Sequence, residues 1–192
     1  MPDPNPAALD FLLSRRSRPA KTLRAPAPTR AALEPLLRAA ARSPDHGKLE
    51  PWRFIVLEAG AMPRLAALAE ARARALELEE TDIAKARQQF DQGVLAVAVI
   101  EVQKPSDKIP GIEQSYSAGA VCLALLNAAL ASGWGANWLT GHISHDRAFC
   151  ETGLGLAPHE RVAGLIHIGT ETAAAPERPR PDLAAITEWV SR

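Results

Sequence analysis

The sequence is poor in cysteine, and this scarcity bears on where the protein works. Only two cysteines, Cys122 and Cys150, occur in 192 residues, so at most one disulfide could form. Small secreted domains commonly depend on several. Cys122 falls in an apolar helical pattern and is expected to be a small core residue. The cysteine content therefore favours a reducing, intracellular setting, and we expect a cytoplasmic protein.

The chain also lacks an excess of charge of either sign, since Lys plus Arg and Asp plus Glu both total 22. Nucleic acids and anionic membranes favour a basic surplus, so the totals indicate neither partner. Residues 1–6 lack the basic start and apolar run of a signal peptide. The most apolar window, residues 118–131, is too short to cross a bilayer and predicts a buried helix.

What the sequence does contain is apolar residues, at 47%, together with 16 prolines and 12 glycines. This composition predicts a folded domain of many short elements. Helical and strand patterns interleave irregularly without a repeat, which indicates an α+β or mixed α/β sandwich. We expect strands at 52–57, 94–102, 133–141 and 161–169, and helices starting at Asn5 or Pro6, after an N-cap at Thr29, and over 62–80, 82–90, 114–132, 147–152 and 183–190.

Residues 41–54 connect a helical pattern to a strand pattern through a polar turn bounded by Pro44 and Pro51. The two prolines restrict the backbone on either side of the turn. Loops held by a rigid scaffold often carry function. His46 in this turn is open to three interpretations, namely a general base, a ligand contact or a hydrogen-bonding residue of the loop. The alternative for the whole segment is a helix-to-strand connection without chemistry.

A basic cluster follows the first predicted helix, where Arg15, Arg16 and Ser17 precede Arg18 and Pro19. The guanidinium fork of arginine suits phosphate oxygens, and a serine hydroxyl adds a donor. The same residues would also be favourable as cations at a helix C-terminus. The local sequence leaves both interpretations open.

Several common motifs are absent. Residues 133–135 read Gly-Trp-Gly but follow a helical pattern and lack the third glycine of a dinucleotide fingerprint. His142 and His145 have no acidic or thiol partner at a supporting spacing, with Cys150 a weak third ligand, so no metal site is expected. Phosphate-binding GxxxxGK and nucleophile-elbow GxSxG motifs are missing.

Four segments taken together resemble the nitroreductase family, in particular its short bacterial NAD(P)H nitroreductases. They are residues 15–17, 43–54, 133–141 and 163–170, in the family's order and spacing, and the likeness runs from about Leu9 to Thr170. The resemblance implies an α+β three-layer sandwich, with a mostly antiparallel central sheet flanked by helices, and a homodimer with FMN at the interface. Residues 1–170 would form the FMN-binding domain, and residues 171–192 a proline-rich arm with a short helix.

The same resemblance implies site residues. Arg15, Arg16 and Ser17 would hold the flavin phosphate and ring edge, and Arg42 and His46 would come from the partner subunit. The other side of the flavin would be lined by Trp138, Leu139 and Thr140. The segment from Ala128 to Gly133 would contact the nicotinamide. No catalytic acid or base is implied, because the flavin carries the chemistry.

The implied activity is FMN-dependent transfer of hydride from NADH or NADPH to nitro-aromatic, quinone-like or other electron-poor acceptors. The alternatives are a flavin-storing or flavin-sensing protein of the same fold, and a scaffold that has lost the cofactor. Two residues depart from the family pattern. Leu139 stands where a polar residue or arginine is expected, and Glu50 where glutamine is more usual.

Overall fold

The computed structural model describes residues 3–192. Residues 1 and 2, which begin the expected 1–170 domain and the segment without signal-peptide features, lie outside the described part. The centre of the fold is a β-sheet whose strands are ordered β1-β5-β3-β2, and β4 pairs with β5 as well. Every pairing is antiparallel. The strands are β1 (Leu23–Arg24), β2 (Trp52–Glu58), β3 (Leu95–Val102), β4 (Gly135–Leu139) and β5 (Glu160–Glu171).

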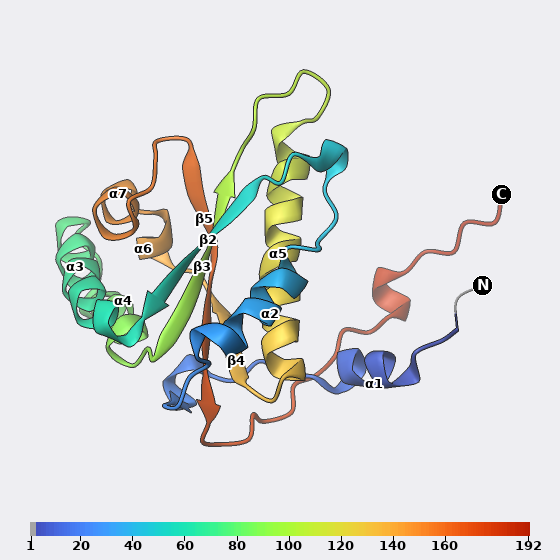
Figure 1. Cartoon of the computed structure of the whole chain (residues 1–192), viewed down its shortest axis with the longest axis horizontal. Helices are drawn as coiled ribbons and strands as arrows, with labels where there is room; N and C mark the ends of the chain where they lie inside the picture. Colours follow the sequence, from blue (N-terminus) through green and yellow to red (C-terminus); the bar gives the residue numbers. More distant parts are fainter. Residues whose placement is uncertain (1–2) are drawn as a thin grey trace.

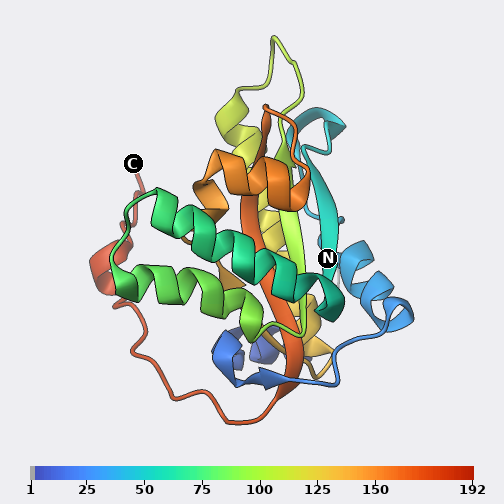
Figure 2. The ribbon, with the colours of Figure 1, turned by 90° about the vertical axis from the view of Figure 1, so that its left-hand side faces the viewer.

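Helices cover both faces of this sheet, which gives three layers (Figure 1). One face carries α3 (Met62–Ala75), α4 (Glu80–Asp91), α6 (His142–His145) and α7 (Arg147–Leu154), seen in front of the sheet in Figure 2. The other face carries α2 (Arg30–Ala40) and α5 (Gly111–Ala131). Helix α1 (Pro6–Ser14) projects beyond α5. The predicted α+β sandwich with an antiparallel sheet is confirmed.

The sheet separates two hydrophobic cores. All eight residues of β3 are buried, and because side chains alternate along a strand they supply both cores. Ala96, Ala98 and Ile100 pack towards α3, α4 and α7, whereas Val97 and Val99 pack towards α2 and α5. This burial on both faces explains why β3 reads as a continuous apolar run.

Helix α5 is long and apolar enough to cross a membrane by length and composition alone. Its buried residues, among them Val121, Cys122 and Leu125, form the core between the sheet and α2. Core helices of soluble proteins meet the same criterion. The placement of Cys122 in this core confirms the sequence prediction.

Two predicted helix starts are confirmed by their caps. The Asn5 side chain accepts a hydrogen bond from the Ala8 amide, at 3.1 Å, and Thr29 accepts one from the Ala32 amide, at 3.3 Å. Such caps satisfy amides that have no partner within the helix.

The helix predicted over 62–80 is wrong at its end, because α3 stops at Ala75 and α4 begins at Glu80. Glu77 adopts φ +53°, and the Leu78 amide donates to the Ala73 carbonyl. These features form a Schellman-type ending, in which the left-handed position usually carries glycine. Because position 77 is a glutamate and not a glycine, the sequence pattern did not indicate that the helix ends there. Helix α5 likewise starts at Gly111, earlier than the predicted 114.

The helix predicted over 183–190 is also wrong, because only the short 3₁₀ turn η4 (Ala184–Ile186) forms there. Leu183, Ile186, Trp189 and Val190 are all exposed. A helix this short gains little from its own hydrogen bonds and needs a packing partner. Within the described chain the arm does not bury these apolar side chains, so the helix has nothing to form against.

Candidate functional site

A cavity of about 510 Å³ lies where the loop after α1, strand β4 and the C-terminal arm meet. The loop contributes Arg15, Arg16 and Ser17, and β4 contributes Trp138. Four of the residues predicted to bind flavin are therefore neighbours in the folded chain. The cavity is completed by further side chains from the same three segments, namely Pro19, Asn137, Ala175, Pro176, Arg178 and Arg180.

Hydrogen bonds to β4 and β5 fix the loop that carries the arginines. The Arg18 amide donates to the Ala136 carbonyl at 2.8 Å, and Asn137 Nδ2 donates to the Arg18 carbonyl at 2.6 Å. The Arg18 side chain pairs with Glu171 at 2.6 Å. Residues 15–17 are thereby held between the end of α1 and the edge of the sheet.

The cavity is strongly cationic, because four arginines line it. Arg15 Nη1 is buried and has no hydrogen-bond partner in the described part of the chain. A buried donor without a partner is unfavourable, and an ionised acceptor such as a phosphate would satisfy it well. Arg16 in contrast pairs with Glu177 at 2.7 Å. The chemistry of this donor set fits an anionic group.

Trp138 packs its indole against the backbone of β5. A β-carbon at Gly164 would overlap the indole of Trp138 and would lie 3.0 Å from Cys122 Sγ. Trp138 remains 36% exposed and lines the cavity. Burial raises the pKa of Cys122 to about 12, so this nearby sulfur stays a neutral thiol.

Leu139 and Thr140 do not line the arginine cavity. They contribute to another cavity, of about 290 Å³, together with His142 and with Asp82 and Lys85 of α4. Because consecutive residues of a strand point to opposite faces, Leu139 faces away from Trp138. The structure thus separates Leu139 from Trp138, although the family resemblance had placed both residues on one side of a flavin.

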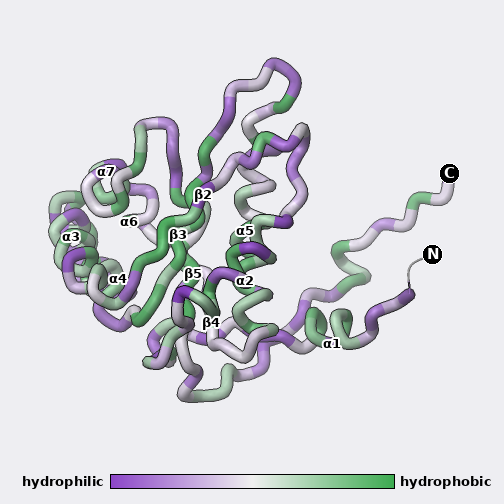
Figure 3. The backbone as a smooth tube through the Cα atoms, in the orientation of Figure 1, coloured by the Kyte–Doolittle hydropathy of each residue, from purple (hydrophilic) through white to green (hydrophobic). Residues whose placement is uncertain are grey.

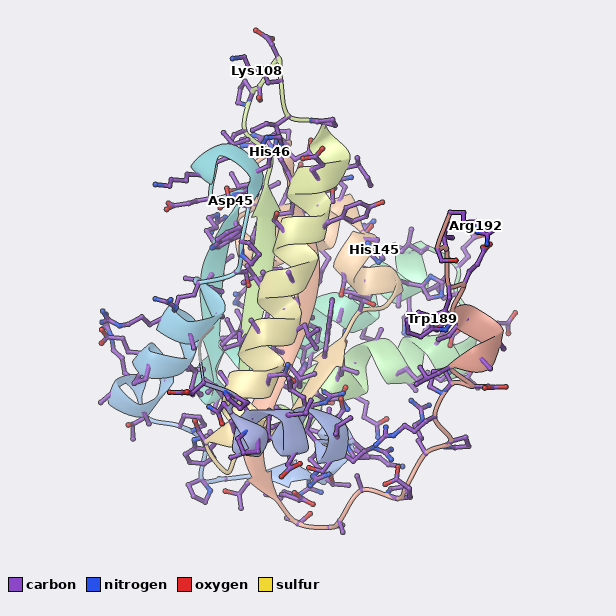
Figure 4. The ribbon with its side chains drawn as sticks, turned by 90° about the vertical axis from the view of Figure 1, so that its right-hand side faces the viewer. Asp45, His46, Lys108, His145, Trp189 and Arg192 are labelled. Carbon is purple, nitrogen blue, oxygen red and sulfur yellow. The ribbon has the colours of Figure 1, made fainter. Side chains whose placement is uncertain are left out.

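His46 lies at the opposite end of α5 from the arginine cavity. Figure 4 shows it above the first turn of α5, with α1 near the other end of that helix. His46 Nδ1 lies 2.7 Å from Glu113 Oε2. A helix of 21 residues is about 30 Å long, which separates His46 from Arg15 by more than one flavin can bridge. Arg42, exposed after α2, belongs to the segment leading to His46.

The turn that carries His46 has an unusual backbone. Gly47, Lys48 and Glu50 all have positive φ, of 72°, 55° and 48°. Such conformations are unfavourable for residues with side chains and persist when the surroundings impose them. One constraint is the hydrogen bond from the Glu50 amide to Asp45 Oδ2, at 2.9 Å. The turn, named η2 (His46–Lys48), is held rather than loose.

The residues expected to contact nicotinamide lie at the end of α5. Ala128 is half-buried against the core that α2, α5 and the sheet share, and Gly133 turns the chain towards β4 with φ +82°. Neither lines the arginine cavity. Among residues 3–192, no group of three or more His, Cys, Asp or Glu side chains could hold a metal ion.

Arg178 and Arg180 were missed by the sequence predictions although both line the cavity. They belong to the proline-rich arm, whose position depends on contacts distant in sequence. The one available signal was the concentration of arginine in residues 178–181, where two arginines alternate with two prolines.

Comparisons with known proteins are consistent with one another. The family model described as "Nitroreductase family" matches residues 12–170. The chain is 34% identical to the Escherichia coli K12 protein named "Putative NAD(P)H nitroreductase YdjA" over 163 residues, 85% of this chain and 87% of that protein. It is 37% identical over 164 residues to a Haemophilus influenzae protein named "Putative NAD(P)H nitroreductase", 85% of this chain and 88% of that one.

Solved structures share the fold. A nitroreductase-like protein from Bacillus cereus superposes with a TM-score of 0.78 at 23% identity, covering 100% of this chain and 99% of the other. A Desulfovibrio desulfuricans protein described as a nitroreductase in complex with FMN gives 0.74 at 22% identity, covering 96% of both chains.

Proposed function

Since the chain belongs to the nitroreductase family, we propose that it is an FMN-dependent oxidoreductase that uses NADH or NADPH as electron donor. The relatives are named as NAD(P)H nitroreductases, and one protein of the same fold is described in complex with FMN. The observation that carries the proposal for this chain is the cavity lined by four arginines, one of which, Arg15, has a buried Nη1 without a partner among residues 3–192.

In this proposal the arginine cavity takes the phosphate end of FMN. Arg15 would donate to the phosphate oxygens through its unpaired nitrogen, and Ser17 would add a hydroxyl donor. Arg178 and Arg180 would add charge from the arm side. Trp138 would present an apolar surface to the flavin beside these cations. Leu139 and Thr140 line the separate cavity beside α4 and are not assigned to the flavin.

Arg42 and His46 would reach the same flavin from a second copy of the chain. Their place at the far end of α5 argues for this, because one chain cannot bring Arg15 and His46 together. Ala128 and Gly133 would contact the nicotinamide. When bound, FMN supplies hydride transfer between the nicotinamide and the acceptor. The residues of this chain bind and orient the reactants, and the acceptors would be nitro-aromatic, quinone-like or otherwise electron-poor.

The homodimer in this proposal is supported by exposed apolar side chains on one side of the molecule. Figure 1 shows α1 and the arm extending on the side of α5 that faces away from the sheet, and Figure 3 shows apolar stretches in all three. Large apolar surfaces of this kind mark interaction sites. The exposed residues are Leu9, Leu12 and Leu13 of α1, Ile112, Tyr116 and Leu123 of α5, and Leu183, Ile186, Trp189 and Val190 of the arm.

We further propose that residues 1–170 are the flavin-binding unit and residues 171–192 the arm, and that the protein is cytoplasmic. The family model ends at residue 170, where β5 is about to give way to the arm. Small molecules, rather than nucleic acids or membranes, are the proposed partners beside the second copy.

The test is an absorbance spectrum of the purified protein after addition of FMN, followed by anaerobic addition of NADH and then NADPH. Bound flavin absorbs at about 370 and 450 nm, and bleaching of these bands reports reduction of the flavin. Bleaching by either nicotinamide supports the proposal. Flavin that binds but is bleached by neither would favour a storage or sensing protein, and absence of flavin binding would contradict both.

A further inference from the structure

We propose that Glu177 is an internal competitor for the cations of the arginine cavity, and that it lowers the affinity of the cavity for phosphate-bearing flavin. This inference rests on the proposed function, since it takes the cavity as the site of the FMN phosphate. It assigns a role in ligand selectivity to a carboxylate of the arm.

One oxygen of Glu177 receives three donors. Oε1 lies 2.7 Å from Arg16 Nη1 and 3.3 Å from Arg180 Nη2, and it accepts the Arg178 amide at 2.9 Å. The Arg16 side chain is 13% exposed, whereas that of Glu177 is 75% exposed. The carboxylate therefore binds a largely buried guanidinium from the solvent side.

Glu177 is the one carboxylate that pairs with the cavity arginines within residues 3–192. The other acid nearby, Glu171, pairs with Arg18, which does not line the cavity. Four arginines and one carboxylate together carry a net charge of +3, that is, four positive charges and one negative charge. Without the Glu177 charge, all four would act on an entering anion.

The carboxylate remains ionised under ordinary conditions. The Arg178 amide, and then the charge and hydrogen bond of Arg16, hold the pKa of Glu177 below its usual value. A phosphate that approaches Arg16 and Arg180 must therefore share them with an anion or replace it. In either case the attraction between the phosphate and these guanidinium groups is reduced.

The effect is specific for the phosphate. Riboflavin has the same ring and ribityl chain as FMN but lacks the phosphate, so it does not compete with Glu177 for Arg16. The ratio of the two affinities isolates the interaction from any general change in flavin binding.

The experiment measures the dissociation constants of FMN and riboflavin by quenching of flavin fluorescence, for the wild type, Glu177→Gln and Glu188→Gln. Glu188 is an exposed acid of the same arm, so its substitution makes the same change in net charge away from the cavity. We expect Glu177→Gln to tighten FMN binding about two- to fivefold, as for a largely solvated ion pair. Riboflavin binding, and both affinities of Glu188→Gln, should stay unchanged.

Unchanged or weaker FMN binding by Glu177→Gln would overturn the inference, and weaker binding would make Glu177 a residue that supports the site. An equal gain in Glu188→Gln would also overturn it, because the effect would then reflect net charge alone. A wild type that binds FMN and riboflavin equally would contradict the phosphate cavity itself. These results separate a failure of the inference from a failure of the proposed function.

Discussion

Trp138 lies directly over the α-carbon of Gly164, so that a β-carbon at position 164 would overlap the indole. The two residues belong to the neighbouring strands β4 and β5. The close approach of the indole is the reason that position 164 requires glycine. The backbone conformation is not the reason, since the φ of Gly164 lies outside the left-handed region. The absence of a side chain at 164 leaves room for the indole of Trp138, a residue that also lines the arginine cavity.

Gly164→Ala should push the indole outward and disturb the cavity. Overpacking of this kind costs about 1–3 kcal/mol, and the moved ring should weaken FMN binding several-fold. Urea unfolding followed by Trp fluorescence measures the first effect, and a flavin titration the second. Gly60→Ala is the matched control, since a β-carbon there meets no atom within 4 Å. Equal stability and equal FMN affinity of the two variants would show that the contact between Trp138 and Gly164 is unimportant.

Arg15→Ala should weaken FMN binding at least tenfold, because one charge-assisted hydrogen bond contributes about 1.5–3 kcal/mol. The fold should be retained, since Arg15 Nη1 bonds to nothing within the described chain. Fluorescence titration with FMN measures the affinity, and circular dichroism checks the fold. Arg38→Ala serves as control, because Arg38 pairs with Glu34 on the exposed face of α2. Unchanged FMN affinity would remove Arg15 from the site.

His167 should make the protein less stable in mild acid. It is 2% exposed on β5, its Nε2 has no partner in the described part, and burial lowers its pKa to about 4. Between pH 6.5 and 4 the unfolded chain binds a proton that the folded chain does not, so the free energy of unfolding falls as the pH falls. The full loss is about 3 kcal/mol.

Urea unfolding at several values between pH 7 and 4 would measure this loss in the wild type and in His167→Leu. The difference between the two curves isolates His167 from the carboxylates, which begin to titrate in the same range. We expect a shallower decline for the variant. Parallel curves would mean that His167 accepts a proton in the folded state.

Asp146 should contribute to the stability of the protein by holding together the helices of the layer beside β4. Its Oδ1 accepts the Arg72 Nε at 2.8 Å and the Phe149 amide at 2.8 Å, so it both pairs with α3 and caps α7. Arg72 also holds the pKa of Asp146 below its usual value. Asp146→Ala loses the pair and the cap and should cost about 2–4 kcal/mol. Asp146→Asn keeps an acceptor for the cap and should cost less, as urea unfolding can measure.

The sequence predicted the parts of the fold whose signal is local. The valine-rich pattern of β3, the apolar pattern of α5 and the caps at Asn5 and Thr29 are each set by neighbouring residues, and the structure confirms them. The end of α3 was not predictable in this way. Glu77 adopts a left-handed conformation without the glycine that normally marks one.

The candidate site was predictable only in part, because it combines distant segments. Arg15 and Trp138 were found through the family resemblance, and the structure places both at one cavity. Arg178 could not be found, since its position depends on where the arm runs after β5. The same dependence explains the wrong helix over 183–190, where apolar residues suggested packing that the single chain does not provide.

The most direct test of a flavin site shared between two copies uses mixed dimers. Arg15→Ala and His46→Ala would be co-expressed with different tags and the heterodimer purified through both. Each heterodimer carries both changes in one site and an intact second site. Each parent should oxidise NADH or NADPH slowly with an electron-poor acceptor, while the heterodimer should regain about half of the wild-type rate. A heterodimer no more active than its parents would contradict the shared site.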